Sequence, residues 1–300
     1  MNASQGLETL RSSTGDSGAP LDVGVLGGGR MGAGIAHAFL LAGSRVTVVE
    51  RDADAAGAAE QRVLESVAAS VARGTADEGA EVLAARFAVS TDVGAFARCG
   101  LVVEAVPEQL ELKIDALTRV EAVLADDAAL ASNTSSISID ELATLLDRPE
   151  RFLGMHFFNP VPASTLVEIV RGRATGSALV GAARDWVRAI GKTPIVVADA
   201  PGFASSRLGV ALGLEAIRML ESGVASAEDI DQAMTLGYKH PVGPLRLTDL
   251  VGLDVRLGIA EYLAETLGSR FEPPALMRRM VAEGKLGRKT GEGFYVWDTP

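Results

Sequence analysis

The sequence GGGRMG at residues 27–32 has glycines at its first, third and sixth positions, directly after an apolar run and directly before a helical one. A dinucleotide-binding turn uses the first, Gly27, for its tight bend and the second, Gly29, for close approach of a pyrophosphate. The third, Gly32, allows close packing of helix on strand, and the N–H groups at the helix start face the phosphates. The motif predicts a dinucleotide site that includes Arg30 and Met31.

The second apolar run of this region ends in Glu50, 18 residues after Gly32. A carboxylate at this position accepts hydrogen bonds from both ribose hydroxyls and repels a 2′-phosphate. The sequence therefore favours NAD over NADP as the cofactor. Arg51 follows directly, and an arginine is able to pair with such a phosphate or to remain a solvated surface charge.

Oxidation of an alcohol by a nicotinamide requires a group that removes the hydroxyl proton, and histidine suits this role near neutral pH. His156 follows the apolar run Phe152–Met155, at the carboxyl end of a predicted strand, where open α/β sheets bind their ligands. Glu168 lies 12 residues later on the next predicted strand and is placed to accept the other imidazole N–H. His37 and His240 are interpreted as structural.

Short apolar runs alternate with longer amphipathic segments through the first two thirds of the chain, which predicts strands joined by crossover helices. The near-continuous apolar character indicates strands covered on both faces. The predicted strands are Val23–Leu26, Arg45–Val49, Phe87–Val89, Leu101–Val103, Ala129–Ala131, Phe152–Met155, Leu166–Val170 and Pro194–Val197. The expected fold class is α/β, a Rossmann-type doubly wound and mostly parallel sheet, followed by an all-α C-terminal domain.

Helical periods predict where the sheet is interrupted and where it ends. The run Ala53–Ala72 exceeds the length of a simple crossover, ends near Gly74, and is expected to form a helical hairpin with 77–84. Ser226, three residues before Asp229, resembles a capping box. After Pro201-Gly202 the expected helices are Phe203–Glu221, Glu228–Leu236, Leu245–Leu267 and Pro274–Glu283. The predicted parts are a tail over residues 1–20, a cofactor domain over 21–198 and a helical substrate and dimerisation domain over 199–300.

Composition limits the remaining classes of function. The 300 residues carry 28 Lys and Arg against 39 Asp and Glu, a net charge of −11, which disfavours a nucleic-acid partner. The sequence has no uninterrupted apolar stretch of about twenty residues, so it does not predict a membrane span. The single cysteine, Cys99, is interpreted as a small apolar residue, and no spacing of ligands indicates a metal site. With no signal segment recognised, the expected location is cytoplasmic.

Six motifs, in order along the chain, resemble the 3-hydroxyacyl-CoA dehydrogenase family, and in particular its short 3-hydroxybutyryl-CoA dehydrogenase members. They extend from the glycine turn to the C-terminal region. The motifs are GGGRMGAGIA at 27–36, VVEAVPEQLELK at 102–113, SNTSS at 132–136, GMHFFNPVP at 154–162, PGF at 201–203 and GRKTGEGFY at 287–295.

The resemblance implies a role for each matching residue. His156 becomes the catalytic base, Glu168 its partner, and Ser135 a hydrogen-bond donor to the substrate oxygen near the nicotinamide. The CoA portion is expected to contact Ser66 and Arg73. The resemblance also implies a homodimer, and cofactor contacts from Glu50, Glu108, Lys113, Asn159 and Lys289.

One position departs from the family pattern. After the PGF turn the family usually presents an asparagine that helps to hold the substrate, and here Ser206 stands in its place. Serine keeps a hydroxyl group but is shorter and lacks the second polar atom of the amide. Catalysis is still expected, with Ser206 beside Ser135 at the reacting oxygen, whereas substrate preference is open.

The sequence therefore predicts reversible, NAD-dependent oxidation of an L-3-hydroxyacyl-CoA, of short chain, to the 3-oxoacyl-CoA. Two alternatives stay open. One is a dehydrogenase of similar build that acts on a hydroxy acid without CoA, such as a sugar acid. The other is a non-catalytic NAD-binding protein, which would retain the glycine turn without needing His156 and Glu168.

Overall fold

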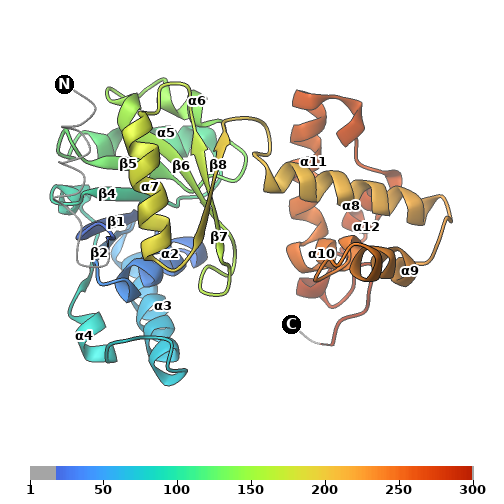
Figure 1. The fold of residues 1–300 in the computed structure, drawn as a ribbon, viewed down its shortest axis with the longest axis horizontal. Helices are drawn as coiled ribbons and strands as arrows, with labels where there is room; N and C mark the ends of the chain where they lie inside the picture. Colours follow the sequence, from blue (N-terminus) through green and yellow to red (C-terminus); the bar gives the residue numbers. More distant parts are fainter. Residues whose placement is uncertain (1–17, 299–300) are drawn as a thin grey trace. The chain divides into compact units, whose positions relative to one another are not determined.

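The computed structural model describes residues 18–298 (Figure 1). Most of the predicted tail over residues 1–20 lies outside the described residues. The chain divides into two compact units, residues 1–199 and 200–300. No helix in the described part of the chain is both long and apolar enough to cross a bilayer.

The first unit contains one eight-stranded sheet in the order β3-β2-β1-β4-β5-β6-β7-β8. Neighbouring strands are parallel except β6 and β7, which are antiparallel. The first six strands have the doubly wound order of dinucleotide-binding folds, and β7 and β8 are added beyond β6. The strands are β1 (Asp22–Leu26), β2 (Arg45–Val49), β3 (Phe87–Ser90), β4 (Leu101–Glu104), β5 (Ala129–Ser132), β6 (Phe152–Phe157), β7 (Leu166–Arg171) and β8 (Thr193–Ala198). The predicted fold class and all eight predicted strands are confirmed.

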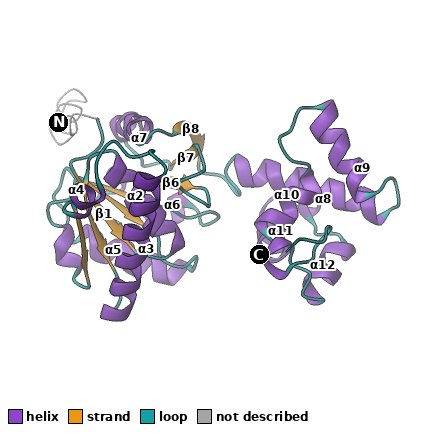
Figure 2. Ribbon diagram, turned by 90° about the horizontal axis from the view of Figure 1, so that it is seen from below, coloured by secondary structure: helices purple, strands orange, loops and turns teal. Residues whose placement is uncertain are grey.

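Helices cover both faces of this sheet (Figure 2). On one face, apolar side chains of α2, α3 and α7 share a single core with the strands, whereas α5 and α6 bury their apolar residues outside that core. The helices are α2 (Arg30–Leu41), α3 (Ala53–Ala72), α4 (Ala80–Ala84), α5 (Leu110–Glu121), α6 (Ile139–Ala143) and α7 (Ser177–Ala189), with 3₁₀ turns at Val93–Phe96 and Pro149–Arg151.

The long excursion between β2 and β3 forms where the sequence predicts it. Helix α3 begins after Asp52, whose carboxylate caps the N–H of Ala55 at 2.7 Å. It ends before Gly74, which adopts a left-handed φ of 69°. Helix α4 then packs against α3 and completes the predicted hairpin.

The second unit is built from helices around its own apolar core (Figure 2). Ser226 caps the helix that its spacing predicts, accepting from the N–H of Asp229 at 3.1 Å. The helices are α8 (Ser205–Glu221), α9 (Ala227–Gln232), α10 (Pro244–Val251), α11 (Leu253–Leu267) and α12 (Ala275–Ala282), with shorter turns at Ala233–Gly237, Ser269–Phe271 and Arg288–Thr290.

One predicted helix, Leu245–Leu267, is wrong, because it is two helices that meet at Gly252. This glycine has a φ of 106°, a conformation that L side chains rarely adopt. The N–H of the next residue, Leu253, donates to the carbonyl of Leu286 at 3.2 Å instead of continuing a helix. A backbone contact with a segment more than thirty residues away therefore sets this break.

Cys99 lies in the first unit and is 4% exposed. Burial raises the pKa of its thiol to about 12, which keeps it protonated and unreactive. This environment agrees with the interpretation of Cys99 as a small apolar residue.

Candidate active site

A cleft of about 570 Å³ opens where β1 passes into α2. Gly27 has a φ of 92°, which L side chains rarely adopt, and a Cβ on Gly32 would lie 1.8 Å from the carbonyl oxygen of Gly27, so both positions require glycine. Gly29 faces open space, since a Cβ built on it would meet no atom within 4 Å. The turn therefore has the tight bend and the open backbone that a dinucleotide pyrophosphate requires, and the residues present fit NAD.

Glu50 lines this cleft at the end of β2. Its carboxylate accepts from the N–H of Gly28 at 2.7 Å and from the N–H of Arg51 at 3.1 Å. These contacts join the second strand to the glycine turn and fix the carboxylate at the cleft wall. Arg51 also lines the cleft, and its guanidinium pairs with Asp52 at 3.0 Å.

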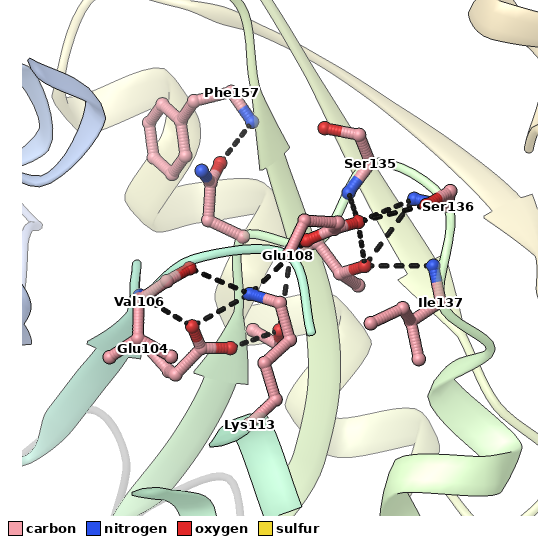
Figure 3. Close-up of polar contacts among 11 residues, drawn as sticks. Glu104, Val106, Glu108, Lys113, Ser135, Ser136, Ile137 and Phe157 are labelled. Carbon is pink, nitrogen blue, oxygen red and sulfur yellow. Dashed lines mark hydrogen bonds and ion pairs between the residues drawn. The ribbon is translucent and has the colours of Figure 1, made fainter. Parts of the chain in front are cut away.

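Below the cleft, a buried lysine joins the ends of β4 and α5 (Figure 3). Lys113 is 1% exposed, and its ammonium group contacts Glu104 at 2.7 Å and Glu108 at 3.3 Å. Glu104 is fully buried and also accepts from the Ser132 hydroxyl at 2.5 Å. The backbone N–H of Val106 donates to the same carboxylate at 2.7 Å. This network ties the cleft wall to the ends of β4 and β5.

Glu108 holds the loop that follows β5 (Figure 3). Its Oε1 accepts from the Thr134 hydroxyl at 2.6 Å, the Ser135 N–H at 2.8 Å and the Ser136 N–H at 3.0 Å. Burial opposes ionisation of this carboxyl, but Lys113 and these hydrogen bonds outweigh it and lower the pKa of Glu108. Ionised Glu108 thus fixes the Ser135 backbone, and Figure 3 shows the Ser135 hydroxyl directed away from that carboxylate.

The ends of β5 and β6 are joined by Asn133. Its side-chain oxygen accepts from the N–H of Phe157 at 2.9 Å, and Asn133 itself lines the cofactor cleft. The next residue back along β6 is His156, so this contact helps to position the strand end that carries the predicted base.

His156 and Glu168 lie directly opposite each other on the antiparallel strands β6 and β7. The imidazole Nδ1 is 2.8 Å from Glu168 Oε2, and the two residues are 4% and 0% exposed. The ring also packs against Phe158, with centroids 4.5 Å apart. Because a buried carboxylate accepts the proton on Nδ1, Nε2 becomes the basic nitrogen, which is the arrangement that proton abstraction requires. The contact predicted from spacing is present.

A second cleft, of about 460 Å³, contains two more of the predicted site residues, Ser66 of α3 and Asn159 of the loop after β6. The Ser66 hydroxyl donates to the carbonyl of Arg62 at 2.9 Å. Arg73 does not line this cleft; its guanidinium donates to the buried Ser70 hydroxyl at 3.2 Å. The structure therefore brings Ser66 and Asn159 together and places Arg73 at the C-terminal end of α3, outside the cleft.

The remaining predicted site residues belong to the second unit. Ser206 lies in the first turn of α8, and the Lys289 ammonium forms an ion pair with Asp254 at 2.6 Å. His240 is partly exposed there. In the first unit, His37 is buried in α2, and its Nε2 lies 2.9 Å from the Ser70 hydroxyl. Its packing between α2 and α3 agrees with a structural role.

Sequence reasoning missed Glu104 as part of the site. The residue closes the apolar strand LVVE, and an acidic residue there resembles the first polar residue of a loop. The sequence did contain a signal, which is the spacing of nine residues between Glu104 and Lys113. A turn and the first residues of a helix lie between them, and this places the lysine beside the strand end.

Family models match both units. The NAD-binding domain of 3-hydroxyacyl-CoA dehydrogenase matches residues 22–200, and the C-terminal domain of the same enzymes matches residues 202–297. The 3-hydroxybutyryl-CoA dehydrogenase of Bradyrhizobium diazoefficiens is 42% identical over 275 residues, which cover 91% of this chain and 94% of that protein. The mitochondrial hydroxyacyl-coenzyme A dehydrogenase of Sus scrofa is 39% identical over 284 residues, covering 92% and 90%.

Among solved structures, the (S)-3-hydroxybutyryl-CoA dehydrogenase of Ralstonia eutropha has a TM-score of 0.88 and 39% identity, covering 93% of this chain and 99% of that one. The fold and the cleft define an NAD-dependent oxidoreductase. The chain belongs to the 3-hydroxyacyl-CoA dehydrogenase family.

Replacing Lys113 tests the buried network. In Lys113→Met, the Glu104 carboxylate loses the ammonium group that it pairs with, and an unpaired buried charge costs about 3–5 kcal/mol of unfolding free energy. The matched control is Arg119→Met on the same helix, where an exposed ion pair with Asp115 contributes less than about 1 kcal/mol. Urea denaturation measures both, and equal losses in the two variants would show that the network does not stabilise the fold.

Proposed function

We propose that this chain catalyses reversible oxidation of a short-chain L-3-hydroxyacyl-CoA to the 3-oxoacyl-CoA, with NAD as cofactor. The observation that carries the proposal is the His156–Glu168 pair, buried on neighbouring strand ends in the same unit as the NAD cleft. Family membership gives the reaction class, and the relatives named for 3-hydroxybutyryl-CoA indicate a short acyl chain.

In this mechanism His156 removes the proton of the substrate's 3-hydroxyl through Nε2. Glu168 stabilises the imidazolium that forms, because its carboxylate already accepts the proton on Nδ1. Bound NAD supplies the acceptor for the hydride that leaves C3. The Ser135 hydroxyl donates to the reacting oxygen, on a loop whose backbone Glu108 fixes. In the reverse direction, His156 returns the proton to that oxygen.

The cofactor contacts proposed from the family pattern agree with the cleft for Gly27, Gly29, Arg30, Met31, Glu50, Glu108 and Ser135, all of which line it. Lys113 lies beneath Glu108. Glu50 accepts the ribose hydroxyls and repels a 2′-phosphate, and the ion pair of Arg51 with Asp52 reduces the attraction that Arg51 would offer to that phosphate.

The roles of five further residues remain proposals, because none of them lines this cleft. Ser66 and Asn159 line the second cleft, which we assign to the CoA thioester, so Asn159 lies outside the cofactor cleft in which the resemblance implied a contact. Arg73 stands at the C-terminal end of the helix that carries Ser66. Ser206 is proposed to bind the substrate oxygen, and Lys289 to contact the cofactor.

The experiment that tests the function is NADH oxidation by the purified protein with acetoacetyl-CoA. We expect turnover that requires both NADH and the thioester, with NADPH at least tenfold less effective in kcat/KM. Free acetoacetate serves as the control for a hydroxy-acid dehydrogenase that does not use CoA. Binding of NADH without reduction of any of these substrates would instead support a non-catalytic protein.

His156→Gln tests the base. The amide fills a similar volume but cannot accept and carry the proton, so kcat should fall by about 10²–10⁴-fold. NADH affinity, measured by fluorescence titration, should change little because His156 does not line the cofactor cleft. An unchanged kcat would remove His156 from the mechanism.

We also propose that the second unit forms a homodimer. Large apolar side chains are exposed on that unit, and such surface is commonly covered by a partner. They include Leu208, Val224, Leu236, Tyr238, Val251, Val255 and Val296. Light scattering should give twice the chain mass of 31.1 kDa, and the single-chain mass would contradict the proposal.

The cytoplasmic location stays a prediction, for which cell fractionation is the test.

A further inference from the structure

The two clefts of the first unit meet at one residue. Arg30, the first residue of α2, lines the cofactor cleft and also lines the second cleft, and no other described residue belongs to both. The second cleft begins on the loop Asn159–Pro162, which directly follows the strand of His156. If the reacting carbon of an acyl-CoA lies at His156, its CoA portion extends along this loop, and the same cleft contains Arg30.

The charges around Arg30 favour an anion. Within residues 18–298 the Arg30 side chain forms no hydrogen bond or ion pair, and no acidic residue stands in the first turn of α2. Arg62 adds a second cation to the second cleft, where its guanidinium donates to the carbonyl of Gly28 at 3.3 Å. The one acid lining that cleft, Glu65, accepts a hydrogen bond from Gln61 at 2.8 Å.

The acids that line the cofactor cleft are already engaged. Glu50 accepts two backbone N–H groups, Glu108 pairs with Lys113, and Asp115 pairs with Arg119 at 3.1 Å. Arg30 is consequently the cation that remains available at the boundary between the two clefts.

We propose that Arg30 contacts phosphate groups of NAD and of the acyl-CoA at the same time, and thereby makes binding of the two ligands cooperative. This inference rests on the proposed function. Both ligands carry negatively charged phosphates, which repel each other across adjacent clefts. The chain itself has a net charge of −11, so a local cation is needed to hold them. A guanidinium carries five N–H donors in a planar fork, which suits it to two phosphates at once. The first ligand to bind orders the exposed Arg30 side chain, so the second ligand binds without that loss of conformational entropy.

Calorimetric titration of NAD⁺ with and without acetoacetyl-CoA measures this coupling, because both ligands are oxidised and no hydride is transferred. The coupling factor is the ratio of the two NAD⁺ dissociation constants, and linkage requires the same factor when the titration is reversed. We expect Arg30→Gln to lower the factor at least about 5-fold, within the usual range for coupled sites. Arg30→Lys, which keeps the charge, should retain most of it. Raising the salt concentration should lower the factor in the wild type, where salt weakens the contacts of Arg30, but should not lower it in Arg30→Gln, where only the repulsion between phosphates is screened.

Two variants serve as matched controls. Arg62 lines only the second cleft and Arg119 only the first, so Arg62→Gln should weaken acetoacetyl-CoA alone and Arg119→Gln should weaken NAD⁺ alone. Neither should change the coupling factor by more than about twofold, which is well below the change expected for a coupling residue. Thermal melting of each variant checks that the fold is retained.

The inference is overturned if the coupling factor in Arg30→Gln equals that of the wild type. It is also overturned if Arg30→Gln, Arg62→Gln and Arg119→Gln all lower the coupling factor equally. The proposed function fails separately, in the turnover assay. Wild-type turnover of acetoacetyl-CoA without coupling that depends on Arg30 rejects only the inference, whereas absence of both turnover and acetoacetyl-CoA binding rejects the function as well.

Discussion

The active site depends on one antiparallel contact in an otherwise parallel sheet. Strands β6 and β7 run in opposite directions, so His156 and Glu168 lie opposite each other as a cross-strand pair. In a parallel pair with a long crossover, the two side chains would need a register set by a distant helix. Here an eight-residue connection fixes the register, and the 2.8 Å contact between imidazole and carboxylate follows from it.

A second set of polar contacts, most of them buried, holds the strand ends around this pair. Glu104 joins β4 to Lys113, Glu108 fixes the loop after β5, and Asn133 joins that loop to the end of β6. The Glu104–Lys113 and Asn133–Phe157 contacts are short and buried, so deleting a partner costs more stability there than at a surface hydrogen bond, whereas the Glu108 contact lies at the exposed cleft wall. The cofactor cleft and the His156 end of the sheet are therefore positioned by one connected network.

Much of the fold could be predicted because its signals are local. Strands covered on both faces appear as continuous apolar runs, and the glycine turn has a spacing that follows from the shape of a pyrophosphate. The pairing of His156 with Glu168 could be predicted as a contact between neighbouring strands, although the strand direction that makes them face each other is a property of the whole sheet.

The features that escaped prediction depend on partners far along the chain or in three dimensions. The helix break at Gly252 arises from a backbone contact with Leu286, which no period in the segment reveals. The role of Glu104 depends on where α5 returns Lys113, and the meeting of two clefts at Arg30 depends on α3 packing beside α2. The spacing of residues in the sequence does not reveal any of these contacts between distant segments.

The central claim is that His156 and Glu168 act as one unit, and a double-mutant cycle in single-turnover rates of acetoacetyl-CoA reduction tests it most directly. The account predicts that Glu168→Gln slows the wild type strongly but changes the rate of His156→Gln by less than about threefold, because groups that act together are not additive. If the fold-loss of rate in the double variant equals the product of the two single fold-losses, the account is contradicted, since the carboxylate then acts independently of the imidazole.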